Sequence, residues 1–103
     1  GREDDMMTAG VYRVSPLEVE TALAGLPGIT ELAVTELQVR EGVRVIAAFC
    51  ISALPLDEAA LAQAAAERLA RYKQPRAWIR VETLPRNANG KLRRRALQDH
   101  ALS

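Results

Sequence analysis

One lysine of this chain stands where it could do chemistry. Lys91 directly follows Gly90, which accepts a positive φ at little cost, and Pro85 restrains the backbone upstream. Asn87 and Asn89 tolerate left-handed conformations, so the segment predicts a sharp turn just before the lysine. An ammonium on such a loop is a compact positive charge, suited to stabilising negative charge that develops on phosphate or carboxylate oxygens. The alternative is a solvated surface lysine, which is the common outcome for a Gly-Lys pair after a turn.

The residues after Lys91 predict a short helix that anchors this loop. Leu92, Ala96 and Leu97 have the spacing of one helical face. Between them, the run Arg93 to Arg95 is a local concentration of positive charge. Three interpretations of this run are open: a solvated helix face, a docking surface for another domain, or a grip on an anionic ligand.

Size and composition restrict the classes of protein to which the chain can belong. With 103 residues it predicts one small domain with a single core. The 14 basic and 13 acidic residues nearly balance, so the net charge of the chain gives it no strong electrostatic attraction to nucleic acid or to a membrane surface. Cys50 lies in an apolar run, where we expect it to belong to the core, and no apolar stretch reaches the length of a membrane span. We therefore expect a cytoplasmic protein.

Two further expectations come from single residues and from the N-terminus. His100 and Cys50 are the only histidine and cysteine, so we expect no metal site. The segment from Gly1 to Asp5 is charged and lacks an initiator methionine, which indicates a piece of a larger protein.

The first half of the chain predicts a hairpin, a helix and two strands. Residues 6–14 predict a β-hairpin that turns at residues 8–10. Ser15 is placed to cap a helix that begins at Pro16, with Glu18 completing a capping box. Strands are then predicted over 29–39 and 43–53, joined by a short turn at Glu41-Gly42. Because both faces of the second strand are apolar, it should be the central strand of a small sheet, antiparallel to its predecessor.

The second half predicts another helix and another strand before the Lys91 loop. Asp57 is a plausible N-cap, and Leu61, Ala65 and Leu69 repeat every four residues. Pro75 ends this helix within residues 72–76, and residues 77–82 alternate as a strand. The predicted fold class is α+β: a small mixed sheet with an N-terminal β-hairpin, two main helices covering it, and a short C-terminal helix.

Four segments of the chain, taken in order, resemble one known family. They are residues 1–7, 12–20, 72–76 and 84–91, the last running from Leu84-Pro85-Arg86 to Gly90-Lys91. Together they resemble the C-terminal domain of adenylate-forming enzymes, which are the acyl-CoA synthetases, nonribosomal adenylation domains and luciferases. The resemblance implies that residues 1–103 are a mobile C-terminal lid domain and that a large N-terminal domain lies outside this chain.

The resemblance also implies an activity. Such enzymes use ATP to convert a carboxylic acid into an acyl-adenylate and pyrophosphate, and then transfer the acyl group to a thiol such as coenzyme A. We therefore expect part of an ATP-dependent carboxylic acid–CoA ligase that uses ATP with Mg²⁺ and coenzyme A. Its partners would be its own N-terminal domain, the acid and coenzyme A, with no nucleic acid and no membrane span. The isolated chain is expected to be inactive and to hold no cofactor tightly.

The family assigns roles to particular residues. By this resemblance Lys91 is the adenylation lysine, Asp4 is the hinge about which the domain rotates, and Arg2 lies near the nucleotide. The hairpin would line the path of the coenzyme A pantetheine arm, with the residues Gly10, Val11, Tyr12 and Arg13. Tyr72, Lys73 and Arg76 would face the coenzyme in the same pose, and the arginine run would grip its phosphate or dock on the large domain.

Val11 departs from the family pattern, which has glycine before the aromatic residue and arginine of the hairpin. A side chain there would obstruct the close passage of the pantetheine arm. Three explanations are open: Gly10 has taken over by a slip of one residue, the valine hampers thioester formation, or the acceptor is unusual. A valine comfortable in a strand is the simplest interpretation.

Two other functions compete with the ligase. One is an adenylation domain of the nonribosomal peptide type. The other is a binding module that holds nucleic acid with Lys91 and the arginine run, although no aromatic residue is interleaved with these basic residues.

Overall fold

The computed structural model describes residues 6–9 and 12–102 of the chain. Its main sheet has three strands in the order β3 (Ile29–Arg40), β4 (Val43–Ser52) and β5 (Ala77–Val81). β3 and β4 are antiparallel, whereas β5 lies parallel to β4. The mixed sheet, its central strand and the antiparallel pairing are therefore as predicted.

A separate two-stranded hairpin precedes the sheet. It consists of β1 (Met7–Ala9) and β2 (Tyr12–Val14), with Met7 opposite Val14. Both of these side chains are buried in the core, and the Thr8 backbone N–H donates to Glu36 Oε2 on β3 at 3.0 Å. The hairpin is confirmed, but Thr8 and Ala9 belong to β1 and not to the turn, and Gly10 lies outside the described residues.

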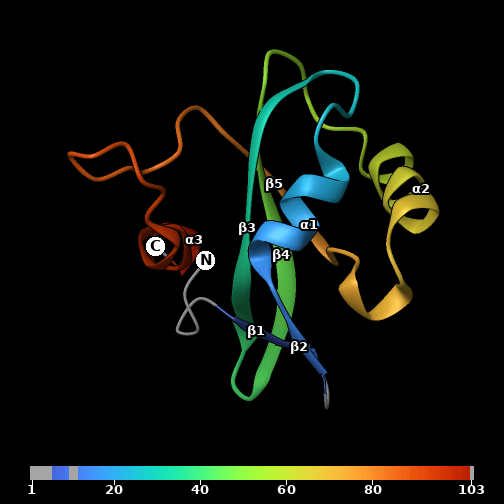
Figure 1. Ribbon diagram of the computed structural model, residues 1–103, viewed down its shortest axis with the longest axis horizontal. Coiled ribbons are helices and arrows are strands. Elements are labelled where there is room, and N and C mark those ends of the chain that lie inside the picture. Colours follow the sequence, from blue (N-terminus) through green and yellow to red (C-terminus); the bar gives the residue numbers. More distant parts are fainter. Residues whose placement is uncertain (1–5, 10–11, 103) are drawn as a thin grey trace.

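Helices cover both faces of the sheet (Figure 1). α1 (Pro16–Leu23) and α2 (Glu58–Arg68) lie on one face, and α3 (Arg94–Leu102) lies on the other. β4 serves both layers because its side chains alternate: Ile46, Ala48 and Cys50 pack toward α1 and α2, while Ala47 and Phe49 pack toward Leu97 of α3. All five of these β4 side chains are buried, as the apolar character of both faces predicts.

The helix boundaries differ in part from the predicted ones. Asp57 caps α2 as expected, accepting from the Ala60 N–H at 3.2 Å. α1 begins at Pro16, but Ser15 makes no capping bond through its side chain, and Glu18 binds Lys73 instead of completing a capping box.

The second predicted helix also ends earlier than expected. α2 stops at Arg68, and a separate 3₁₀ turn, η2 (Arg71–Lys73), leads to Pro75.

Of the residues described, none belongs to a helix long and apolar enough to cross a membrane.

Candidate functional site

The loop that carries Lys91 is closed by backbone hydrogen bonds at both ends. The Asn87 N–H donates to the Lys91 carbonyl at 2.9 Å, and the Arg93 N–H donates to the Pro85 carbonyl at 2.8 Å. Arg86 and Leu92 form an isolated antiparallel bridge between these two bonds. Leu92 therefore belongs to the closure of the loop and not to α3, to which its spacing had assigned it. The backbone of Lys91 is fixed, while its side chain is exposed.

The tip of the loop depends on one asparagine side chain and one glycine. Gly90 has φ +81°, as predicted, whereas no non-glycine residue among those described has a positive φ. Asn87 and Asn89 therefore do not adopt the left-handed conformation that was expected of them. Asn87 acts through its side chain: its Oδ1 accepts from the Asn89 N–H at 2.9 Å and from the Lys91 N–H at 3.0 Å.

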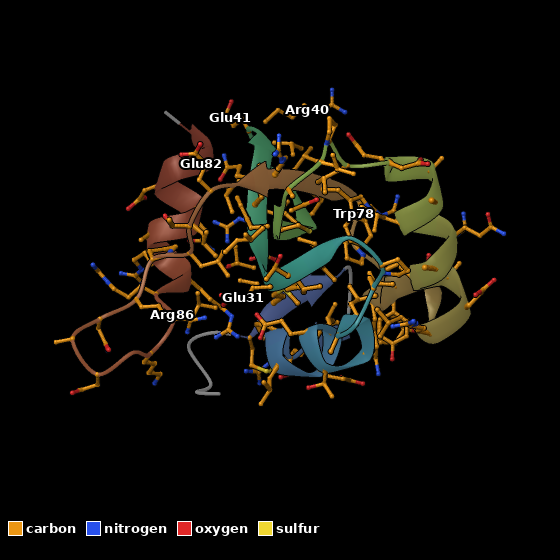
Figure 2. All side chains as sticks on the ribbon, turned by 90° about the horizontal axis from the view of Figure 1, so that it is seen from above. Glu31, Arg40, Glu41, Trp78, Glu82 and Arg86 are labelled. Atoms are coloured by element: carbon orange, nitrogen blue, oxygen red, sulfur yellow. The ribbon has the colours of Figure 1, made fainter. Side chains whose placement is uncertain are left out.

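Arg86 ties the tip of the loop to the sheet. Its Nη1 donates to the Gly90 carbonyl at 3.1 Å, and its Nη2 donates to Glu31 Oε1 on β3 at 2.7 Å. Figure 2 labels Arg86 on the loop and Glu31 on the strand. Both side chains are nearly half exposed, so this pair orients the loop more than it stabilises the fold.

A more buried ion pair holds the downstream end of the loop. Arg94, the first residue of α3, donates to both carboxylate oxygens of Glu20 at 2.7 and 2.8 Å. Its Nε also donates to the Val34 carbonyl at 3.0 Å, and the Val34 N–H donates to Glu20 Oε2 at 2.8 Å. Only 12% of the Arg94 side chain and 15% of the Glu20 side chain are exposed. The pair therefore joins α1, β3 and α3 three residues after Lys91.

Sequence reasoning did not single out Arg94 within its run of three arginines. A usable signal was its position three residues before the buried Leu97, which places both on one face of α3. The identity of its partner, 74 residues earlier on α1, had no local signal.

A second group of predicted residues meets between β2 and η2. The rings of Tyr12 and Tyr72 stack with centroids 4.1 Å apart, and Lys73 Nζ lies 5.5 Å from the Tyr72 centroid. The hydrogen bond that Lys73 donates to the Glu18 carboxylate raises the pKa of Lys73. Both tyrosines are partly exposed although they stack. This aromatic pair joins two segments that the resemblance had linked to coenzyme A.

The structure keeps these two groups of residues apart. In Figure 1 the Lys91 loop projects on the α3 side of the sheet, whereas η2 lies on the side of α2. Arg13 on β2 and Arg76 before β5 are exposed. The other predicted site residues, Arg2, Asp4, Gly10 and Val11, lie outside the described part of the chain.

The cysteine and the metal-binding residue types offer no further site. Cys50 is fully buried, as expected of a core residue, and burial raises the pKa of its thiol to about 11. In the described ranges, no group of three histidine, cysteine or carboxylate side chains is placed to hold a metal ion.

Known ligases are similar to this chain in both sequence and fold. A 2-succinylbenzoate–CoA ligase of Bacillus licheniformis is 36% identical over 93% of the chain and 20% of that protein. A 4-chlorobenzoate–CoA ligase of a Pseudomonas species is also 36% identical, over 97% of the chain and 20% of that protein. The structure of an anthranilate CoA ligase in complex with anthranoyl-AMP superposes with a TM-score of 0.88 at 34% identity, over 98% of the chain and 20% of that structure.

The chain therefore spans about a fifth of the length of the curated relatives it matches. The matched region of the family model covers residues 18–91, from the first turn of α1 to the lysine of the loop. Since this region includes most of the chain, the protein belongs to the family of AMP-binding enzyme C-terminal domains.

Proposed function

We propose that this chain is the C-terminal domain of an ATP-dependent carboxylic acid–CoA ligase, and that Lys91 acts in the adenylation step. The observation that carries the proposal is the exposed ammonium on a loop whose backbone is fixed at both ends. The printed names of the relatives, which are ligases of 2-succinylbenzoate, 4-chlorobenzoate and anthranilate, support the class of reaction.

In the proposed first half-reaction, a carboxylate oxygen of the acid attacks the α-phosphorus of ATP, and the bond to the β-phosphate bridging oxygen breaks. Pyrophosphate leaves with that electron pair. Negative charge on the α-phosphate oxygens increases as the new bond forms, and the Lys91 ammonium would stabilise it from a preorganised position. Lys91 takes part in the hydrogen bonds of the loop only through its backbone N–H and carbonyl, so its side chain is available for this contact.

In the proposed second half-reaction, the thiolate of coenzyme A attacks the acyl carbon of the adenylate, and AMP leaves. The domain would first rotate about Asp4, with Arg2 near the nucleotide, and would present the hairpin and the Tyr12–Tyr72 pair to the coenzyme. The separation of the Lys91 loop from this aromatic pair supports two poses, because one orientation could not present both sides to the same active site.

The class of reaction is tested with the full-length protein. Exchange of labelled pyrophosphate into ATP should depend on a carboxylic acid, and thioester formation should require coenzyme A. A panel of aryl acids and of short, medium and long acyl acids would identify the substrate. Exchange supported by amino acids alone, followed by loading of a carrier protein, would instead favour the nonribosomal type. That alternative has support in a plipastatin synthase of Bacillus subtilis, which is 33% identical over 96% of this chain and 3% of that protein.

One of the basic residues on which the nucleic-acid alternative depends is not available to bind phosphate. Arg94 is engaged with Glu20 and largely buried, so the arginine run does not present three charges to a nucleic acid backbone.

Replacing Val11 with glycine is predicted to accelerate acyl transfer to coenzyme A by about tenfold, because a Cβ no longer narrows the path of the pantetheine arm. Single-turnover transfer from preformed adenylate measures this step, and pyrophosphate exchange should not change. Val39→Gly is the matched control, since Val39 is a half-exposed valine that belongs to β3 and not to either strand of the hairpin. An unchanged transfer rate in Val11→Gly would mean that the valine does not obstruct the thiol.

A further inference from the structure

A basic cleft lies between the beginning of α3 and the β3–β4 strands. Its volume is about 510 Å³, within the range of small-molecule sites. Thr35 and Gln98 contribute neutral polar groups to the cleft, and Arg44 lines it from β4. The remaining basic side chains come from the end of the Lys91 loop and the first turn of α3, including Arg93 and Arg95.

The shape of this segment explains why neighbouring side chains line the same cleft. In a regular helix, residues two positions apart point in different directions. Here Leu92 is still part of the bridge with Arg86, and α3 begins only at Arg94. Because the chain is not helical before Arg94, Lys91 and Arg93 can line the same cleft as Arg95 at the start of the helix.

Only some of the charges around the cleft are neutralised within the domain. Arg94 is paired with Glu20, and Arg44 is paired with Glu36 at 3.2 Å. Lys91, Arg93 and Arg95 have no carboxylate partner in the part of the chain that the structure describes. The whole chain has a formal charge of only +1, so this concentration of positive charge is local.

The groups lining the cleft would not repel an anion strongly. The Glu36 carboxylate accepts from both the Thr8 N–H and Arg44, and Gln98 Nε2 donates to the Thr35 hydroxyl at 3.2 Å. In the first turn of α3, Arg95 opposes the helix dipole without a carboxylate partner among the described residues, and that turn contains no acidic residue. An anion from outside the domain would offset this unfavourable arrangement.

We propose that this cleft binds the diphosphate or triphosphate group of a nucleotide substrate, through Arg93 and Arg95 with Lys91 at its edge. The planar guanidinium fork matches phosphate oxygens in a bidentate manner, which a lone ammonium does not. The inference rests on the proposed function for the source of the phosphates, which is either ATP and its pyrophosphate product or coenzyme A.

The test uses the full-length protein and the double variant Arg93→Gln/Arg95→Gln. The KM values for ATP and pyrophosphate are measured in the exchange reaction, and the KM for coenzyme A is measured in acyl transfer. We expect the KM of one of these two sources to rise about tenfold, with kcat changed less than about threefold. A rise for ATP and pyrophosphate assigns the cleft to the adenylation pose, and a rise for coenzyme A assigns it to the transfer pose.

Two matched variants show whether charge alone is responsible. Arg93→Lys/Arg95→Lys keeps the charge but loses the fork, so its KM should lie between those of the wild type and the glutamine variant. Arg40→Gln removes an exposed arginine that does not line the cleft and should leave every KM unchanged. Figure 2 shows Arg40 well separated from Arg86 of the Lys91 loop.

Two results would overturn the proposal. One is an unchanged KM for ATP, pyrophosphate and coenzyme A in the glutamine variant. The other is a fall in kcat of a half-reaction at constant KM, which would assign the arginines to docking on an acidic surface of the large domain.

A measurement without turnover separates this proposal from the proposed function. Calorimetric titration of the full-length proteins with inorganic tripolyphosphate should show about tenfold weaker binding to the glutamine variant than to the wild type. Equal affinities would overturn the cleft proposal. A wild type that binds tripolyphosphate through these arginines but shows no acid-dependent exchange would contradict the proposed function alone.

Discussion

Replacing Lys91 with glutamine is expected to slow acyl-adenylate formation in the full-length protein by about a hundred- to a thousandfold, equivalent to roughly 3 to 4 kcal/mol of transition-state stabilisation. Glutamine keeps most of the length and one donor group of lysine but lacks its charge. The loss should fall on kcat more than on KM, because the charge that the ammonium meets increases only as the phosphorus is attacked. Acid-dependent exchange of pyrophosphate into ATP measures this step without the thiol.

The second half-reaction provides an internal control for this variant. Acyl transfer from preformed adenylate to coenzyme A should change little, because the Lys91 loop lies away from the Tyr12–Tyr72 pair. Lys73→Gln is the matched substitution: it removes the only other lysine of the chain and should leave exchange intact. An exchange rate within a few fold of the wild type in Lys91→Gln would refute the assignment of the adenylation lysine.

Loss of activity in Lys91→Gln should not come from loss of structure. The bonds that close the loop involve backbone groups of Lys91 and the side chains of Asn87 and Arg86, so the substitution leaves all of them in place. The thermal midpoint should therefore be unchanged.

Patterns of apolar residues were sufficient to predict the sheet and its covering helices. β4 was identified as central because both of its faces are apolar, and Phe49 and Cys50 are indeed buried on opposite faces. Asp57 was identified as an N-cap because an aspartate directly before a helical pattern commonly accepts a hydrogen bond from a backbone N–H of the first turn. These predictions depend on residues that are near one another in the sequence.

The predictions failed where a side chain had two partners to choose from. Glu18 had the spacing of a capping box, but Lys73, 55 residues later, binds its carboxylate. Asn87 was expected to contribute its backbone conformation and instead contributes a side-chain acceptor to two N–H groups. In both cases, tertiary structure determined which of two local options was used.

In the candidate site, too, the features set by nearby residues were predictable and those set by distant residues were not. The turn, Gly90 and the exposed lysine followed from the residue types of one short segment. The supports of that segment, Glu31 on β3 and Glu20 on α1, are distant in sequence and had no pattern that pointed to the loop. The exposed position of the lysine after the turn was therefore predictable, but the structure that positions it was not.

The largest expected effect on stability comes from breaking the ion pair between Glu20 and Arg94. Arg94→Ala should destabilise the domain by about 3 kcal/mol, because it leaves the Glu20 carboxylate largely buried with only the Val34 N–H as a described partner. It also removes the donor to the Val34 carbonyl. Equilibrium unfolding of the 103-residue chain in urea measures the change as a lower midpoint at constant slope.

Arg95→Ala is the control, since Arg95 is the exposed neighbour of Arg94 on the same helix, and its free energy of unfolding should change by less than about 0.5 kcal/mol. Equal losses in the two variants would mean that the ion pair contributes no more than a surface charge.

Removing the carboxylate as well separates the ion pair from the packing around it. The double variant Arg94→Met/Glu20→Met leaves no unpaired charge, and apolar replacements of a buried pair are often nearly neutral. Recovery should be incomplete here, because the Val34 N–H and carbonyl both lose their side-chain partners. A double variant that is more stable than Arg94→Ala would show that the cost of the single change comes from the uncompensated carboxylate. An equal or greater loss would instead mean that the hydrogen bonds to Val34, and not the charge pairing, join α1 and α3 to β3.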